Sequence, residues 1–274
     1  MKLTMLGTGN ATVTECFNTC FVISEEQEHF LIDTGGGNRI LKVLKDGGIP
    51  LNEIHEIFIT HEHLDHLLGI LWLIRMIGTK INQGEYEGTL SIYCHSELVE
   101  KICAMAEMTI QKKVCRHIGK EILFVAIDDG EQMKILDTDV TFFDIGSTKA
   151  KQYGFTMVTR DGIKLTCLGD EPYNRINEDY VQGSDWLMHE AFCLYGEAEK
   201  FKPYEKHHST VREACETAQR LQVPNLILYH TEETHLADRK ELYTQEGRKY
   251  YSGNLYVPED LESFEIKRSL KFPG

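Results

Sequence analysis

Short apolar runs alternate with amphipathic segments along the chain, as they do in mixed α/β proteins. Apolar residues at 20–23 and 29–32 flank a polar turn, an arrangement typical of a β-hairpin. Three consecutive apolar residues, Ile57 to Ile59, indicate a buried strand. The pattern predicts strands over 1–6, 20–32, 54–60, 90–94, 122–127, 140–145, 155–159, 164–168, 184–188 and 226–229, and helices over 38–46, 67–77, 96–108 and 211–221.

The last of these helices has a clear start signal. Thr210 and Glu213 have the spacing of a capping box, and apolar residues follow at helical spacing. The order of strands, helices, strands and helices shows no repeat of fixed period, no linker and no break in composition. We therefore expect a single α/β domain over 1–274, built of two related halves.

The composition and net charge of the chain exclude some classes of protein and of binding partner. The 274 residues are 42% hydrophobic and 26% charged, which is ordinary for a globular protein. Lys and Arg number 29 against 43 Asp and Glu, so the formal net charge is -14 and the general surface repels a phosphate backbone. The apolar run 70–74 ends at Arg75, which predicts no membrane span. Eight cysteines without CxxC pairs, and no signal-peptide pattern, predict reduced thiols in the cytoplasm.

A histidine cluster directly follows the buried strand at 54–60. His61, His63, Asp65 and His66 lie within six residues. Imidazole nitrogen and carboxylate oxygen are the ligands that zinc-like dications prefer near neutral pH. Alternation in an extended turn places His61 and His63 on one side, whereas Asp65 and His66 begin the next helix. The segment therefore predicts ligands for two neighbouring metals, and the competing interpretation is a polar loop of unrelated histidines.

The segment 61–66 has the HxHxDH form of the metallo-β-lactamase fold superfamily, and the chain resembles that superfamily over roughly 1–266. The further matching segments are Leu6-Gly7-Thr8-Gly9, Asp33-Thr34-Gly35, Leu168-Gly169-Asp170, His189-Glu190-Ala191-Phe192, His208-Ser209-Thr210 and 226–230. The segments at 189 and 208 are similar to the HEAT and HST segments of the ribonuclease Z-like branch. This resemblance implies a four-layer αβ/βα sandwich, with two mixed β-sheets packed face to face, helices outside and metals at one edge.

The resemblance also implies a ligand set. It assigns His61 and His63 to a first metal, and Asp65, His66 and His230 to a second. Asp170 would bridge the two, since two carboxylate oxygens can hold cations ~3.5–4 Å apart. Two alternatives stay open: Asp170 as a turn residue after Gly169, and His235 as the ligand in place of His230.

The chain departs from the branch at the third histidine of the first metal. Gly146 stands at that position and has no side chain to offer. Three protein ligands and a water can still hold a catalytic zinc. Alternatively the first site is empty, or His95, His117 or Asp144 fills the gap. We therefore expect one or two Zn2+ ions, with Mn2+ or iron as acceptable substitutes for the same donors.

A second departure concerns the substrate. Ribonuclease Z carries an arm that grips transfer RNA, and the stretch 153–170 is too short to hold one. Together with the acidic surface, this predicts that transfer RNA is not the substrate. The expected substrate is a small phosphodiester or a short nucleic acid: a cyclic nucleotide, a short oligonucleotide or a modified phosphodiester. Because relatives dimerise, the resemblance also implies a homodimer.

The expected reaction is metal-assisted hydrolysis of a phosphodiester, in which the metal lowers the pKa of water and offsets phosphoryl charge. Asp65 accepts the water proton, as relatives imply. His208 donates a proton to the leaving oxygen or holds the phosphate, and Glu190 orients His208. Other roles for these residues stay open: Glu190 is a structural carboxylate, and His208 simply precedes a helix cap. His207 is an alternative proton donor, and His189 is expected to orient its own segment. The residues after Gly146, namely Lys149, Lys151 and Gln152, lie either in a solvated loop or in contact with the substrate.

Two other classes of function compete with the phosphodiesterase. Hydrolases of the same fold act on thioesters, lactones or β-lactams, but the paired segments at 189 and 208 are not expected in them. A non-catalytic binding protein on a degenerate site is favoured only by Gly146. The retained histidines and carboxylates favour a metallo-hydrolase.

Overall fold

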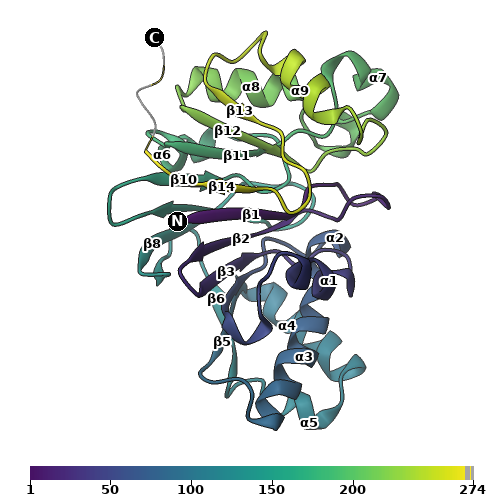
Figure 1. Cartoon of the computed structure of the whole chain (residues 1–274), viewed down its shortest axis with the longest axis vertical. Helices are drawn as coiled ribbons and strands as arrows, with labels where there is room; N and C mark the ends of the chain where they lie inside the picture. Colours follow the sequence, from purple (N-terminus) through teal and green to yellow (C-terminus); the bar gives the residue numbers. More distant parts are fainter. Residues whose placement is uncertain (269–271, 273–274) are drawn as a thin grey trace.

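Two β-sheets form the centre of the molecule (Figure 1). The computed structural model describes residues 1–268 and 272, and within that part each sheet has seven strands. Across the first sheet the strands are β14 (Ser263–Glu265), β1 (Lys2–Gly7), β2 (Cys20–Glu25), β3 (Glu28–Ile32), β4 (Ile54–Phe58), β5 (Leu90–His95) and β6 (Ile122–Ile127). Across the second they are β13 (Asn254–Tyr256), β12 (Asn225–Tyr229), β11 (Trp186–Glu190), β10 (Lys164–Cys167), β9 (Tyr153–Val158), β8 (Thr138–Asp144) and β7 (Gln132–Ile135).

Both sheets are mixed. In the first, β14, β1, β2 and β3 pair antiparallel, and β3, β4, β5 and β6 pair parallel. In the second, β7 to β10 pair antiparallel, and β10 to β13 pair parallel. The parallel strands need helical crossovers, so helices cover the outer faces of the sheets.

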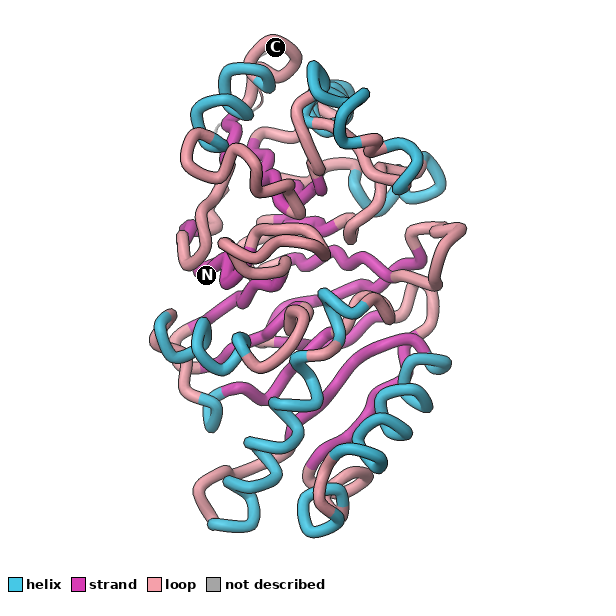
Figure 2. Tube along the Cα trace, turned by 90° about the vertical axis from the view of Figure 1, so that its right-hand side faces the viewer, coloured by secondary structure: helices cyan, strands magenta, loops and turns pink. Residues whose placement is uncertain are grey.

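Each sheet has apolar side chains on both faces. Phe30 of β3 and Phe155 of β9 pack edge to face between the sheets, at a centroid distance of 5.9 Å. The neighbouring residue, Leu31, points the other way, into the core beneath the outer helices. A third core lies between the second sheet and its helices, around Leu226 and Val211. The result is the expected four-layer αβ/βα sandwich (Figure 2).

The helices divide between the two halves. The first half carries α1 (Arg39–Asp46), α2 (Leu64–Leu67), α3 (Gly69–Gln83), α4 (Ser96–Thr109) and α5 (Lys112–Cys115), with the 3-10 turn η1 (Leu51–Glu53). The second carries α6 (Glu178–Val181), α7 (Ala198–Phe201), α8 (Val211–Arg220) and α9 (Arg239–Gly247), with η2 (Arg175–Asn177), η3 (Tyr195–Glu197) and η4 (Tyr204–Lys206). In the described residues no helix is long and apolar enough to cross a bilayer.

Most predicted elements are present, with shifts at their ends. The helix predicted over 67–77 is two helices, α2 and α3, and α3 continues to Gln83. The capping box of α8 is confirmed. The hydrophobic pattern did not predict β7, β13, β14, α5, α6, α7 or α9. The eight cysteines all lie in the described part of the chain and are free thiols.

Candidate metal centre and active site

The predicted site residues come from both halves and meet at one edge of the sandwich. His61 and His63 lie in the loop after β4, and Asp65 and His66 lie in α2. From the second half, Asp170 follows β10, Glu190 ends β11, and His230 follows β12. His208 precedes α8. Apart from His208, these groups lie at or just after the carboxyl ends of strands, where α/β folds gather their sites.

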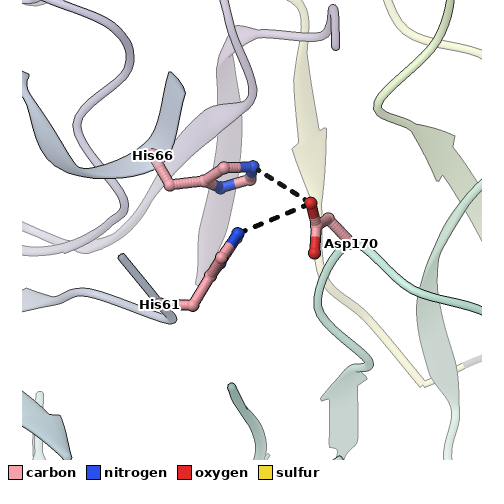
Figure 3. Close-up of side chains that lie close together, drawn as sticks. All are labelled: His61, His66 and Asp170. Carbon is pink, nitrogen blue, oxygen red and sulfur yellow. Dashed lines mark ion pairs between the residues drawn. The ribbon is translucent and has the colours of Figure 1, made fainter. Parts of the chain in front are cut away.

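One carboxylate oxygen is the focus of this edge. Oδ2 of Asp170 lies 3.6 Å from Nε2 of His61 and 3.5 Å from Nε2 of His66 (Figure 3). Nε2 of His230 is 3.7 Å from the same oxygen and 3.3 Å from Oδ2 of Asp65. These groups are all buried. Separations of this size are what groups around a shared cation show, because each would lie about 2 Å from the ion.

A hydrogen bond to the carboxylate of Asp33 orients the His66 ring. Its Nδ1 donates to Oδ2 of Asp33 at 2.7 Å, which leaves Nε2 to face Asp65 and Asp170. That Nε2 is buried and has no hydrogen-bond partner. A carboxylate behind the ring is the usual support of a metal-binding histidine. Gly69 permits this arrangement, since a Cβ there would lie 2.0 Å from the carbonyl oxygen of Thr34.

His61 is oriented through the same carboxylate. The hydroxyl of Thr60 donates to Oδ2 of Asp33 at 2.8 Å, and it accepts from Nδ1 of His61 at 2.9 Å. The backbone N–H of Thr60 donates to Oδ1 of Asp33. Asp33 therefore positions both imidazoles. The sequence placed it in a matching segment but gave it no role, and its signal was an acidic residue ending a buried strand.

Two of these residues lie on unusual backbone. Asp33 has φ 56° and His230 has φ 58°, in the left-handed region. Asp and His enter this region more readily than most residues, although it still costs energy. Such strain is often kept at functional sites.

His63 lies closer to its neighbour than to the centre of the cluster. Its Nδ1 is 2.8 Å from Nε2 of His61. Around the cluster, the compact groups of potential ligand atoms in the described residues are His61–His66–Asp170, Asp65–His66–His230 and Asp170–His208–His230, and none of them includes His63. The structure therefore brings together the residues predicted for the second metal, with Asp170 beside them. Of the two histidines predicted for the first metal, only His61 lies in a group with Asp170.

The gap at Gly146 is not filled by any of the residues named as alternatives. His117 contacts Glu121 and Asn82, and Asp144 accepts from the N–H of Gly146 itself. His95 is buried with both ring nitrogens unpaired, but it belongs to none of the ligand groups found in the described residues.

Gln152 contacts the bridging carboxylate instead. Its Nε2 donates to Oδ1 of Asp170 at 2.7 Å, and the side chain is buried. The solvated-loop alternative is therefore wrong for Gln152. Because Oδ1 accepts from the amide, Oδ2 of Asp170 is the oxygen that faces the imidazoles.

The charges of the cluster fit a divalent cation. Burial alone would raise the pKa of Asp65, but His66 and His230 hold that pKa below its usual range. Asp170 is held low in the same way, by His61 and His66. Burial lowers the pKa of His61, which keeps that imidazole neutral and able to bind metal. Burial lowers the pKa of His66, but Asp65 and Asp33 outweigh this and raise it above its usual range, so a cation would take the place of the His66 proton. Two buried carboxylates and the imidazoles around them form a donor set suited to zinc-like metals.

Glu190 and His208 form a second functional pair beside this cluster. Oε2 of Glu190 lies 3.6 Å from Nδ1 of His208, and both atoms are buried without a hydrogen-bond partner. Oε1 of Glu190 accepts from the backbone N–H and the hydroxyl of Ser209. The His208 ring is stacked on Phe192, at a centroid distance of 5.1 Å and an angle of 5°.

This pair is poised to hold a proton. Burial raises the pKa of Glu190 well above its usual range, although Ser209 acts in the opposite direction. Burial, followed by the neighbouring His230, lowers the pKa of His208 to about 3. A carboxylic acid facing a neutral imidazole shares one proton, which can move to the ring when a nearby charge favours the imidazolium.

The remaining candidates lie outside the cluster. Nδ1 of His189 donates to the carbonyl oxygen of Glu190, so this ring orients its own segment. His207 is exposed, and the ammonium of Lys149 donates to the carbonyl oxygen of Lys206. His235 contacts Glu197 and not the carboxylates of the cluster.

A pocket of about 570 Å³ opens beside His208. Its lining includes Gly146, Asn174, Arg175, Tyr204 and His207. Volumes of 300–1,000 Å³ are typical of sites for small ligands. No pattern in the sequence indicated this pocket, because its walls come from three separate segments.

Comparisons with known proteins agree with this geometry. The family model described as Anti-Pycsar protein Apyc1 matches residues 1–248. Ribonuclease Z of Thermococcus sibiricus is 26% identical over 302 aligned residues, which cover 96% of this chain and 95% of that protein.

Two solved structures share the fold. The metallo-beta-lactamase fold protein YhfI from Bacillus subtilis superposes with a TM-score of 0.77 at 16% identity, covering 96% of this chain and 98% of that one. The short form of human tRNase Z gives a TM-score of 0.75 at 21% identity, covering 97% and 100%. The metallo-β-lactamase architecture expected from the sequence is thus confirmed.

Proposed function

Because the chain belongs to the family of Anti-Pycsar protein Apyc1, within the ribonuclease Z-like branch of the metallo-β-lactamase fold, we propose that it is a metal-dependent phosphodiesterase acting on a small phosphodiester. One observation carries the proposal: buried imidazoles and carboxylates from both halves converge around Oδ2 of Asp170, and the facing Nε2 of His66 has no hydrogen-bond partner. A cation held at such a site would activate water and polarise the phosphoryl oxygens of a phosphodiester.

The metal residues of this proposal are His61, His63, Asp65, His66, Asp170 and His230, and the metal is Zn2+, in one or two copies. A divalent cation there supplies hydroxide near neutral pH and offsets the charge of the phosphoryl oxygens. Mn2+ and iron would be accepted by the same donors.

The protein's own residues handle the protons. Asp65 accepts the proton of the attacking water as the new P–O bond forms. The old P–O bond breaks, and the leaving oxygen takes a proton from His208. Glu190, 3.6 Å behind the His208 ring, holds that proton in reserve and returns it to the imidazole.

A cyclic nucleotide is the substrate that the pocket fits best among the small phosphodiesters. The volume of about 570 Å³ suits a single nucleotide, and Arg175 and Tyr204 on its wall offer a cation and an aromatic ring. The connection between β9 and β10 spans only residues 159–163, which supports the expectation that transfer RNA is not a substrate. Ribonuclease Z is what the relatives are named, so precursor transfer RNA belongs in the substrate panel.

We further propose that residues 1–274 act as one domain in the cytoplasm and form a homodimer. The shared metal centre supports the single domain, and eight free thiols support a reducing compartment. The homodimer is carried over from the resemblance to the ribonuclease Z-like branch. Light scattering after gel filtration measures the oligomeric state directly.

The test is a substrate panel with the zinc-loaded protein. It contains a 3′,5′-cyclic nucleotide, a short oligonucleotide, a precursor transfer RNA, a thioester and a lactone. We expect turnover of the cyclic nucleotide, abolished by a chelator and restored by zinc. His208→Ala should reduce turnover by roughly 10²–10⁴-fold without changing metal content. His55→Ala, in β4 and outside the pocket lining, is the control and should retain turnover. Preferential cleavage of the thioester or lactone would refute the proposal.

A further inference from the structure

A second cluster of potential ligands lies away from the metal centre. Glu197 ends η3, and Glu232 and His235 lie in the loop that follows β12. One oxygen of each carboxylate and one ring nitrogen of His235 lie within 4.8 Å of one another. Nε2 of His235 is 2.8 Å from Oε2 of Glu197. None of these side chains has a part in the proposed reaction.

Glu232 supplies the second, independent observation. The residue is only 4% exposed, and its Oε2 accepts from the backbone N–H of Thr234 at 2.5 Å. Its Oε1 is buried and has no hydrogen-bond partner. A buried carboxylate oxygen without a donor is costly, so its retention points to a missing cation.

The negative charge of Glu232 has no ion-pair partner among the described residues. Among the ion pairs of the described residues, none involves Glu232, and Glu197 contacts only His235 and the half-exposed Lys200. The buried guanidinium of Arg239 is bonded elsewhere, to Thr231, Thr8 and Pro258.

The buried Cys193 thiol reports the same field. Its pKa is raised to about 12, first by burial and then by Glu232, with Glu197 among the further carboxylates that contribute. The thiol is therefore protonated at neutral pH. The negative charge of the cluster comes from its carboxylates alone.

We propose that Glu197, Glu232 and His235 bind a divalent transition-metal ion, of which Zn2+ is the best match. One imidazole and two carboxylates favour transition metals over Mg2+ and Ca2+. Three protein ligands leave the fourth tetrahedral position to water. The side chains of Glu197 and His235 are 26% and 28% exposed, which gives an ion a path from solvent.

Such an ion would tie together two segments beneath the proton donor. The backbone N–H of Glu232 donates to the carbonyl oxygen of Phe192, and the Phe192 ring is stacked on His208. The metal would link Glu197, at the end of η3, to Glu232 and His235 in the loop that follows β12. Its effect is on the rigidity of the His208 segment, and it takes no part in the chemistry.

The experiment removes the metal centre first, so that its result is independent of the proposed function. In the full chain, Asp65→Asn and Asp170→Asn together disable the centre, and Co2+ then serves as a spectroscopic probe. We expect visible d–d absorption from one bound Co2+ per chain, competed away by Zn2+. Adding His235→Ala should abolish that absorption.

The matched control is His117→Ala. His117 also pairs with a glutamate, Glu121, at 2.9 Å, but it lacks a second carboxylate. This variant should keep the Co2+ signal. Glu232→Gln, which preserves side-chain shape, should weaken Co2+ binding at least tenfold in a titration. Absence of Co2+ absorption in the double variant, or its persistence after His235→Ala, would overturn the proposal.

A zinc count in the otherwise unaltered chain provides a second readout. By native mass spectrometry, His235→Ala should hold one zinc fewer than the parent protein, and His117→Ala should hold the same number. Equal counts in all three proteins would contradict the site even if a variant were less stable.

Discussion

Gln152 is the residue that most changes the picture of the metal centre. Its amide fixes Oδ1 of Asp170, which leaves Oδ2 to face the imidazoles. Gln152→Leu keeps the volume but removes the donor, so Asp170 is free to turn. Losing such a supporting bond typically costs 10–100-fold in metal affinity.

We therefore expect Gln152→Leu to bind zinc about 10–100-fold more weakly, measured by competition with a chelating dye. Gln182→Leu, an exposed glutamine exchanged in the same way, is the control. Equal affinities for the two variants would mean that Gln152 does not position Asp170.

A histidine restored at Gly146 should not rebuild the first site. Gly146 has φ +74°, and a Cβ there would lie 2.6 Å from Cδ1 of Ile176. The left-handed backbone costs a side chain about 1–2 kcal/mol. We expect Gly146→His to unfold at lower urea concentration and to hold no additional zinc. Gly146→Ala separates the two effects, because it carries the backbone strain without an imidazole. One more zinc in Gly146→His than in Gly146→Ala would contradict the expectation.

His189 links stability to pH. Burial lowers its pKa from 6.5 to about 4. Between these values the unfolded chain binds a proton that the folded protein excludes, so the free energy of unfolding decreases as pH falls through this range. The slope for one group is at most about 1.4 kcal/mol per pH unit. The stabilisation is complete above pH 6.5 and lost towards pH 4.

His189→Asn keeps a donor for the carbonyl oxygen of Glu190 and removes the titration. Urea unfolding at pH 7.5 and 5.0 should therefore show a smaller loss of stability for His189→Asn than for the parent protein. The exposed His207→Asn should lose as much as the parent. An identical pH dependence for all three would show that His189 is not the titrating group.

Among the elements, helix α8 connects stability to the position of His208. The backbone N–H and the hydroxyl of Thr210 both donate to the carboxylate of Glu213, at 2.7 and 2.5 Å. The hydroxyl of Tyr204 donates to the same side chain. Glu213→Ala removes the acceptor of all three hydrogen bonds, so we expect a loss of about 1–2 kcal/mol in the free energy of unfolding.

Glu216→Ala is the matched control on the same helix. Glu216 pairs with Arg212 on the exposed surface, where an i,i+4 pair contributes only about 0.3–0.5 kcal/mol. Chemical unfolding of both variants compares the two costs. A loss for Glu213→Ala no larger than for Glu216→Ala would mean that the cap does not stabilise α8.

The local pattern of apolar and polar residues predicted most of the helices and strands that bury several apolar side chains. The strand at 54–60 and the helix at 211–221 are examples, since their own residues specify the period. By contrast, α9 buries only Arg239, Tyr243 and Gly247, and β14 has three residues. Such elements depend on contacts made after the chain has folded, so a local pattern could not predict them.

The site divides in the same way. The segment 61–66 carried its own chemical signal, and the segments around Asp170 and His230 were found through resemblance. The hydrogen bonds of Asp33 and Gln152 could not be predicted, because each joins residues that are distant in sequence: Asp33 is 27 positions from Thr60 and Gln152 is 18 from Asp170.

For the whole molecule, the metal centre is also a joint between the two halves. His66 comes from the first half, and Asp170 and His230 come from the second. A ligand that binds only the folded state adds about 2.7 kcal/mol at 100 times its dissociation constant. We expect a chelator to lower the thermal midpoint of the zinc-loaded protein. Asp170→Asn should show a much smaller shift under the same conditions, and equal shifts in the two proteins would contradict a stabilising role for this centre.

The pairing of β14 with β1 has a consequence during synthesis. β1 is made first, but its outer edge is covered only by residues 263–265 (Figure 1). The hydroxyl of Thr8 donates to Asp260 and accepts from Arg239, so its hydrogen bonds also form only after these residues have been synthesised. At about 5–20 residues per second, a ribosome needs tens of seconds to supply these partners. Throughout that interval the nascent chain presents a bare strand edge, the kind of surface that pairs with other chains. Chaperone dependence during translation is therefore expected to be greatest for copies stalled before residue 260.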